Sequence, residues 1–467
     1  MLISKVKYLA TKIRAFLKQI SPLVKVVREL RRFRISLIYN AHKVIFHLKS
    51  IWNMVSKAEQ SRQKVLKIAI PISGICSFDN LERVMEELRI NYVKHKNTLY
   101  IPPQPSLISL FGEIVNLYPD NAGFKILRYP ENPDGLCSLL DKVVVANYLY
   151  LKRIAPRLYD FVELYVGETS FKVFVVQHME GDKPNDTEKI SFVENVRKLV
   201  ETRELLMDSR KGENPQVVST IYQGCSSSLL MSNEDKQLYC LDFQNYNVAN
   251  PKKLIRNIAI EGRDSLHYGS KRFLRRSKYF YQSIPSIGAY GRRDVTVRWK
   301  AIKRLMNEAD VNFDEKLVLD IGCNAGMMLS QALADGAWWG LGWDKPVVVE
   351  HAQRLLMALG YTRFDLRGVE LARDYQLLND IHTRFSSKLD ESIIFYLAIR
   401  EYFGFMSVLC RIPWKVIIYE GHKGEKQADL SNDLSELYKM CPFSIASSTE
   451  YNDGDSHERT LAVLIRN

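Results

Sequence analysis

Two aspartates in the C-terminal third of the chain stand where a nucleoside-type ligand could be held. Asp320 lies within the apolar run 317–321, and the small-residue turn Gly322–Gly326 directly follows this run. Asp344 ends a second apolar run, 24 residues after Asp320. The carboxylate of Asp320 would repel a pyrophosphate but can hold a cationic amino acid group, and Asp344 can accept hydrogen bonds from two ribose hydroxyls. These residues predict a site for a nucleoside that carries a cationic amino acid group.

The surrounding pattern predicts a doubly wound α/β sheet that positions both aspartates. The turn opens onto an expected helix, Met327–Ala334, at the carboxyl edge of a parallel sheet, where such folds bind ligands. Two more strands are expected at 391–398 and 414–420, and a closing hairpin at 443–465. A Rossmann dehydrogenase is the alternative. However, the turn reads Gly-Cys-Asn-Ala-Gly rather than Gly-x-Gly-x-x-Gly, and the hairpin also distinguishes the two sheets.

With these motifs, residues 300–467 resemble the class I S-adenosylmethionine-dependent methyltransferases, and Val318–Gly326 is similar to the first motif of that family. The resemblance implies a seven-stranded Rossmann-like sheet and S-adenosyl-L-methionine as cofactor. Asp344 would bind the ribose, and Asp365 would contact the adenine edge. The cofactor-binding residues that the resemblance implies are Asp320, Gly322, Asn324, Gly326, Asp344 and Asp365.

Candidate catalytic residues follow the fourth and fifth expected strands. A hydroxyl nucleophile needs a base within hydrogen-bond reach, and Glu401 or His422 could serve. Arg400 could hold an anionic substrate. The alternative is that all three are ordinary loop residues. No grouping of residues in the sequence suggests a metal site.

The region 70–255 has a different, strand-rich pattern. It predicts a hairpin at 91–101, a strand with an inward Lys125 at 123–128, a helix at 143–154 and a strand at 171–178. With Asp242 in the later Asp-Phe-Gln triplet, this order resembles the bacterial lipopolysaccharide and small-molecule kinases. The resemblance implies that Lys125 binds phosphate and Asp242 holds magnesium, so ATP and Mg²⁺ are candidate cofactors.

Several positions depart from that kinase pattern. The expected catalytic loop has Gln223 and Ser228 where a kinase needs Asp and Asn. The expected helix has Ala146 and Asn147 where a Glu should pair with the lysine. We therefore expect a kinase-like α+β domain without activity, with an active kinase and an unrelated α+β domain as alternatives.

The excess of positive charge is concentrated in an N-terminal arm, 1–60. The whole chain has a net charge of +13, yet residues 1–58 alone contain 13 Lys/Arg and one acid. Apolar residues recur there at heptad spacing, which predicts two amphipathic helices that meet near Pro22. Such an arm can form a coiled coil in a homo-oligomer, bind an anionic membrane surface, or grip nucleic acid.

The sequence as a whole predicts four segments: the arm 1–60, the kinase-like domain 70–255, a connector 256–299 and the methyltransferase domain 300–467. No apolar run reaches the length of a membrane span, and the seven scattered cysteines are typical of a reducing compartment. We expect a cytoplasmic protein, peripheral on the inner membrane face.

The favoured function is O-methylation of a cell-envelope glycan or glycolipid, at a sugar hydroxyl or a terminal phosphate. This rests on an architectural similarity to the methyltransferase-kinase proteins that cap O-antigen polysaccharides. The alternatives are an RNA methyltransferase that grips phosphates through the arm and the basic connector, and a non-enzymatic oligomeric scaffold.

Overall fold

The computed structural model describes most of the chain from Gln63 onward. The described residues are Gln63, 66–70, 78–95, 98–127, 135–166, 169–201, 205–207, 229–241, 246–248, 251–262, 280–369, Ile381, 384–399, 410–421, Leu430, 434–453 and 458–467. The chain divides after Ala58, and all of these residues belong to the second unit, Glu59–Asn467. The basic arm lies outside them, so its helices, its oligomerisation and its membrane contact stay predictions.

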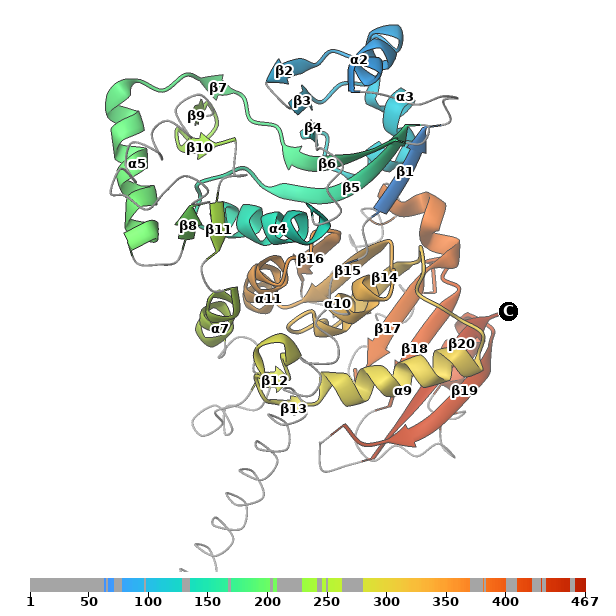
Figure 1. Ribbon diagram of the computed structural model, residues 1–467. Helices are drawn as coiled ribbons and strands as arrows, with labels where there is room; N and C mark the ends of the chain where they lie inside the picture. Colours follow the sequence, from blue (N-terminus) through green and yellow to red (C-terminus); the bar gives the residue numbers. More distant parts are fainter. Residues whose placement is uncertain are drawn as a thin grey trace, which may run out of the picture. The chain divides into compact units, whose positions relative to one another are not determined.

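A seven-stranded sheet forms the C-terminal part of this unit (Figure 1). Its strands are β14 Leu317–Ile321, β15 Trp339–Asp344, β16 Phe364–Gly368, β17 Ile393–Leu397, β18 Val416–Glu420, β19 Phe443–Tyr451 and β20 Arg459–Arg466. Their order across the sheet is β16-β15-β14-β17-β18-β20-β19. The strands from β16 to β18 are parallel, and β20 is antiparallel to both of its neighbours. The predicted Rossmann-like sheet with a closing hairpin is confirmed.

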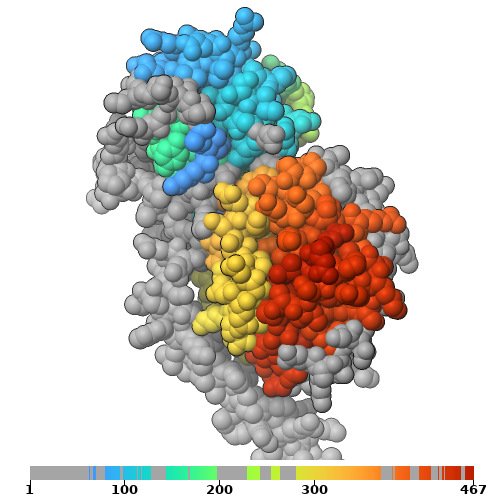
Figure 2. All heavy atoms as spheres, turned by 90° about the vertical axis from the view of Figure 1, so that its right-hand side faces the viewer, coloured from blue at the N-terminus to red at the C-terminus, as the bar shows by residue number. Residues whose placement is uncertain are grey.

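Both faces of this sheet are covered, which explains its almost continuous apolar strands. Every residue of β14, β17 and β18 is buried. The helices of this part are α9 Val295–Glu308, α10 Met327–Ala334, α11 Pro346–Ala358 and α15 Ser435–Met440, with 3-10 turns at Pro285–Ile287 and Ser386–Glu391. Figure 2 shows α9, in yellow, beside the C-terminal strands, in red. The Ser447 hydroxyl of β19 donates a hydrogen bond to the Leu305 carbonyl of α9 at 2.8 Å.

A second sheet of six strands lies in the middle of the chain. Its strands are β1 Leu66–Ile70, β2 Val93–His95, β3 Thr98–Ile101, β4 Ala122–Leu127, β5 Leu158–Val166 and β6 Thr169–Gln177. The order is β1-β5-β6-β4-β3-β2, in which the β1–β5 pair is parallel and the other pairs are antiparallel. The helices α2 Phe78–Glu87, α3 Leu107–Phe111 and α4 Gly135–Leu151 and a 3-10 turn at Gly112–Leu117 connect these strands.

The expected elements of this region are confirmed with shifted boundaries. The hairpin at 91–101 is the pair β2–β3, and the two other expected strands are β4 and β6. The expected helix at 143–154 begins eight residues earlier, at Gly135. This earlier start is consistent with the leucines at 136, 139 and 140, which are good helix formers.

The remaining described elements are short. The strands β7 Gly181–Asp182, β9 Leu229–Ser232 and β10 Leu238–Cys240 form one small sheet, and β8 Leu205–Met207 pairs with β11 Tyr246–Val248. The helices are α5 Asp186–Glu201 and α7 Pro251–Glu261. The boundary expected at 255–256 therefore lies inside α7, and the expected connector includes a further strand pair, β12 Phe280–Gln282 with β13 Gly291–Arg293.

The two large sheets share one hydrophobic core. Tyr118 packs edge-on against Phe124 of β4 and against Trp339 of β15, with ring centroids 5.9 and 6.0 Å apart. Asn147 of α4 donates to the carbonyls of Met357 and Tyr361, at 2.9 and 3.3 Å. Because Trp339 begins β15 and Tyr361 precedes β16, the middle region meets the C-terminal sheet at the amino ends of these strands, away from Asp344.

Among the described helices, none has the length and apolarity needed to cross a bilayer. Within the same residues, no group of three His, Cys, Asp or Glu side chains is arranged to hold a metal ion.

Candidate functional site

The turn after β14 lies at the carboxyl edge of the seven-stranded sheet and is held against the end of β15. The amides of Gly322 and Cys323 donate to the Trp343 carbonyl, at 2.8 and 3.1 Å. Gly322, Asn324 and Gly326 have φ angles of 72°, 49° and 71°. Glycine adopts this left-handed backbone without strain, and a Cβ at Gly326 would also lie 2.7 Å from Leu356.

Asp344 links this turn to the adjacent strand. One carboxylate oxygen accepts from the Asn324 amide at 2.9 Å, and the other accepts from the Lys345 amide at 2.7 Å. Burial raises the pKa of Asp344, and the two backbone hydrogen bonds oppose that shift. Each carboxylate oxygen can accept a second hydrogen bond, so the partly exposed group is able to receive two hydroxyls.

Asp320 is the buried acid of the site. The residue is 2% exposed, and burial, together with the charge of Asp344, raises its pKa to about 8 against the opposing effect of Arg298. Within the described residues, Asp320 Oδ2 and Asn324 Oδ1 are buried without a hydrogen-bond partner. Two unsatisfied acceptors at one sheet edge favour a ligand that donates hydrogen bonds and carries positive charge.

Asp365 does not belong to this edge. It pairs in register with Leu341, whereas Asp344 pairs with Gly368, so β16 continues three residues beyond Asp365 before it reaches the carboxyl edge. The Asp365 carboxylate instead accepts a hydrogen bond from Arg384 at 3.1 Å. The family resemblance implied an adenine contact at Asp365, but the pairing register places Asp365 within β16, before the carboxyl end of the strand.

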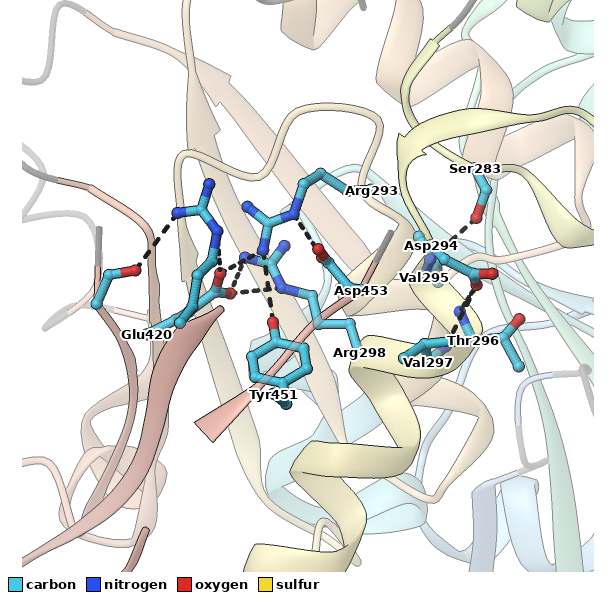
Figure 3. A network of polar contacts seen from close by, with 12 residues as sticks. Ser283, Arg293, Asp294, Val295, Thr296, Val297, Arg298, Glu420, Tyr451 and Asp453 are labelled. Atoms are coloured by element: carbon cyan, nitrogen blue, oxygen red, sulfur yellow. Dashed lines mark hydrogen bonds and ion pairs between the residues drawn. The ribbon is translucent and has the colours of Figure 1, made fainter. Parts of the chain in front are cut away.

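Sequence reasoning missed a buried charge cluster on the same edge, at the end of β18 (Figure 3). The Glu420 carboxylate is contacted by three guanidinium groups, and Asp453 contacts one of them. The Nε of Arg298 donates to Glu420 at 2.7 Å, and Arg293 lies between Glu420 and Asp453. We call this set, Arg293, Arg298, Arg459, Glu420 and Asp453, the guanidinium cluster.

The guanidinium cluster is strongly coupled electrostatically. Burial alone would raise the pKa of Glu420, but Arg298 and Arg293 outweigh it and lower that pKa to about 2. Burial alone would lower the pKa of Arg293, but Glu420 and Asp453 outweigh it and raise that pKa. The one sequence signal for the cluster was an acid at the end of an apolar strand, as at Asp344. Its arginines lie at separate positions along the chain.

No family model matches the sequence, and no curated protein matches it. Solved structures do match. They include magnesium protoporphyrin IX methyltransferase (ChlM) from Synechocystis PCC 6803 with bound SAM, at 16% identity and a TM-score of 0.30, covering 47% of this chain and 98% of that chain. They also include a putative S-adenosylmethionine-dependent methyltransferase from Listeria monocytogenes, at 13% identity and a TM-score of 0.28, covering 37% and 100%.

A third match is EvdMO1, at 15% identity and a TM-score of 0.26, where the similarity covers 38% of this chain and only 42% of the EvdMO1 chain. At such low similarity these structures assign no chemistry to this chain.

The remaining predicted site residues are placed as follows. The candidates Arg400, Glu401, His422 and Asp242 lie outside the described residues. Lys125 is partly buried on β4, and its Nζ donates to the Leu241 carbonyl at 3.4 Å, one residue before Asp242. Asn147 of α4, which the kinase resemblance placed at the position of a glutamate, donates hydrogen bonds to the C-terminal part of the chain.

Proposed function

We propose that the chain is an S-adenosyl-L-methionine-dependent methyltransferase. The observation that supports it most is the pair of unsatisfied buried acceptors, Asp320 Oδ2 and Asn324 Oδ1, beside Asp344 at the carboxyl edge. These groups fit the cofactor, because its methionine part carries an ammonium and a sulfonium charge and its ribose carries two hydroxyls. When bound, the cofactor supplies an electrophilic methyl carbon.

In this proposal each residue of the edge has a distinct role. Asp320 and Asn324 receive the ammonium group, and Asp344 receives the ribose hydroxyls. The turn Gly322–Gly326 lets the backbone approach the ligand closely, which fixes the orientation that an in-line transfer requires. Glu420 is unsuited to be the base because its pKa is about 2. Glu401 or His422 is proposed for that role.

Cofactor binding is the direct test. Titration of the full chain with S-adenosyl-L-homocysteine in a calorimeter should show one site per chain. Asp320→Ala and Asp344→Ala should each weaken binding at least tenfold, since a charge-assisted hydrogen bond contributes about 1.5–3 kcal/mol. Glu391→Gln, an exposed acid paired with Lys316, is the matched control and should bind normally. Absence of binding to the wild-type chain would refute the proposal.

We propose further that the acceptor is a cell-envelope glycan or glycolipid. The support comes from the sequence, in the basic arm and the kinase-like order of the middle region. Purified protein would be incubated with bacterial extract and methyl-labelled cofactor, and lipid-linked glycan, RNA and protein would be separated. Label in glycan that is lost with Asp320→Ala is expected. Label in RNA would instead support the RNA methyltransferase, and the lack of label with intact cofactor binding would support the scaffold.

For the middle region we propose a kinase-like domain that no longer transfers phosphate. The order of its strands and the contact between Lys125 and Leu241 support this relationship. Asn147 supports the loss of activity, because it occupies the helix position of the missing glutamate and binds the C-terminal part instead. Titration with ATP, with and without Mg²⁺, tests whether a nucleotide still binds, and Lys125→Met should abolish any binding found.

A further inference from the structure

Asp320 and Glu420 lie on the same face of the seven-stranded sheet. Asp320 pairs in register with Phe395 of β17, and Glu420 pairs with Leu397, two residues further along that strand. Paired residues of neighbouring strands point to the same side of a sheet, and so do residues two positions apart in one strand. This is the face that α9 covers, because Trp299 packs edge-on against Phe395 with ring centroids 6.2 Å apart.

Arg298, the residue before Trp299, carries a buried positive charge to this face. It is 2% exposed, and its guanidinium points toward Glu420, to which Nε donates at 2.7 Å (Figure 3). Glu420 on β18 is two strands away from Asp320 on β14, which corresponds to about 10 Å across the sheet. Water screens charges little in a protein interior, so a charge at such a separation still acts on Asp320.

Three ionisable groups lie close enough to interact with Asp320: Arg298 from α9, Asp344 from β15 and Cys323 from the turn. Arg298 favours the ionised carboxylate of Asp320, whereas burial and Asp344 oppose it. The Cys323 thiol adds no charge, because burial and both aspartates raise its pKa well above the ordinary value. Of the three groups, Arg298 is therefore the one that offsets the cost of a buried carboxylate.

We infer that Arg298 is a positioning residue for cofactor binding that acts through Asp320: its buried guanidinium favours the charged carboxylate that receives the ammonium group. Glu420 keeps Arg298 in place by accepting hydrogen bonds from its Nε and Nη2. Arg298 needs no contact with the ligand for this role. The inference rests on the proposed methyltransferase function and connects the guanidinium cluster to it.

The pH profile of S-adenosyl-L-homocysteine binding tests this role. Wild-type affinity should level off near the pKa of Asp320, about 8. Arg298→Gln removes the charge but keeps a donor for Glu420, and should shift this midpoint upward by about one pH unit, so that affinity at neutral pH falls about tenfold. Arg298→Lys keeps the charge and should keep the wild-type midpoint. Direct repulsion between Arg298 and the ligand would change only the plateau at high pH.

Arg293→Gln is the matched control, because Arg293 is also buried and also contacts Glu420. It should move the midpoint clearly less, since Arg293 lies between Glu420 and Asp453 and a charge acts more weakly with distance. Equal shifts in Arg293→Gln and Arg298→Gln would overturn the inference. A loss of affinity at every pH without a shifted midpoint would show a merely structural role and would overturn it as well.

A titration without the cofactor separates this inference from the proposed function. The infrared C=O stretch of the protonated Asp320 carboxyl, identified by its loss in Asp320→Asn, would be followed against pH. Arg298→Gln should raise this midpoint too, and an unchanged midpoint would overturn the inference even where the cofactor binds. The infrared shift without cofactor binding would contradict the proposed function but would leave the coupling of Arg298 to Asp320 established.

A second variant decides if Arg298→Gln fails to fold. In Glu420→Gln, Arg298 loses the carboxylate charge that it contacts, so its own charge acts on Asp320 without that compensation. The midpoint of Asp320 should then fall below that of the wild-type chain, a shift that loss of folding cannot imitate. A midpoint that stays or rises in Glu420→Gln would overturn the inference.

Discussion

At the amino edge of the seven-stranded sheet Asp160 is buried against Thr362 and Arg363, whereas at the carboxyl edge Glu420 is buried against Arg293 and Arg298. Asp160 accepts hydrogen bonds from Tyr118 at 2.9 Å and Thr362 at 3.0 Å, and Arg363 Nε lies 3.9 Å away. In the guanidinium cluster the Glu420 carboxylate contacts Arg293, Arg298 and Arg459, and Asp453 also contacts Arg293.

The two clusters lie at opposite edges of the sheet and connect different elements. The amino-edge cluster joins β5 of the middle sheet to the segment before β16, so it connects the two large sheets. The guanidinium cluster joins the end of β18 to Arg298 of α9 and to Arg293 directly before that helix, on the edge where doubly wound sheets bind ligands.

The largest effect should come from removing the central acid of the guanidinium cluster. Glu420→Gln removes the carboxylate charge that all three buried arginines contact, so we expect the free energy of unfolding to fall by about 3–5 kcal/mol. Urea denaturation followed by tryptophan fluorescence measures this change. Glu391→Gln, in an exposed pair, should cost less than about 1 kcal/mol. If the two variants unfold alike, the cluster is not the buried network described above.

At the amino edge, Asp160→Ala should cost about 1–3 kcal/mol, because it leaves the Tyr118 and Thr362 hydroxyls without their acceptor. The change should weaken the connection between the two sheets, so that calorimetry resolves two transitions. Asp186→Ala, an exposed acid of the middle region, is the control. Cofactor affinity should stay within twofold of wild type. A large loss of cofactor affinity would show that the amino edge also controls the site.

The pH dependence of cofactor binding tests Asp320. Its pKa of about 8 means that the free protein keeps this carboxyl protonated through the neutral range. A cationic ligand requires the ionised form, so its affinity should rise with pH up to about 8, by as much as about tenfold per pH unit, and level off above. Calorimetric titration from pH 6.5 to 8.5 measures this. In Asp320→Asn the affinity should be lower and nearly constant; a wild-type profile without slope would argue against Asp320.

The smallest effect is expected at Asp365. Its contact with Arg384 is partly exposed, so Asp365→Asn should cost about 0–1 kcal/mol and leave S-adenosyl-L-homocysteine affinity unchanged. Calorimetric titration beside the wild-type chain checks both statements. A tenfold loss of affinity would support the adenine contact that the sequence resemblance implied, despite the placement of Asp365 near the start of β16.

Much of the fold could be predicted because local patterns dictated it. The apolar runs of β14, β17 and β18 predict buried parallel strands, and the small residues at Gly322–Gly326 predict the sharp turn that the structure shows. The end of β16 could not be predicted, since pairing with β15 decides it. Packing also decides the role of Asn147, which contacts a carbonyl 210 residues away in the chain.

The sequence by itself determined the type of sheet, the turn after β14 and the aspartates Asp320 and Asp344, because each depends on residues close together in the chain. Tertiary structure alone decided the pairing of Glu420 with Arg293 and Arg298, which are 127 and 122 residues away. Burial then decided the ionisation of these groups: it raises the pKa of Asp320, while neighbouring arginines lower that of Glu420. The ionisation of a buried group depends on which other groups contact it in the folded protein. These contacts cannot be read from the order of the residues in the sequence.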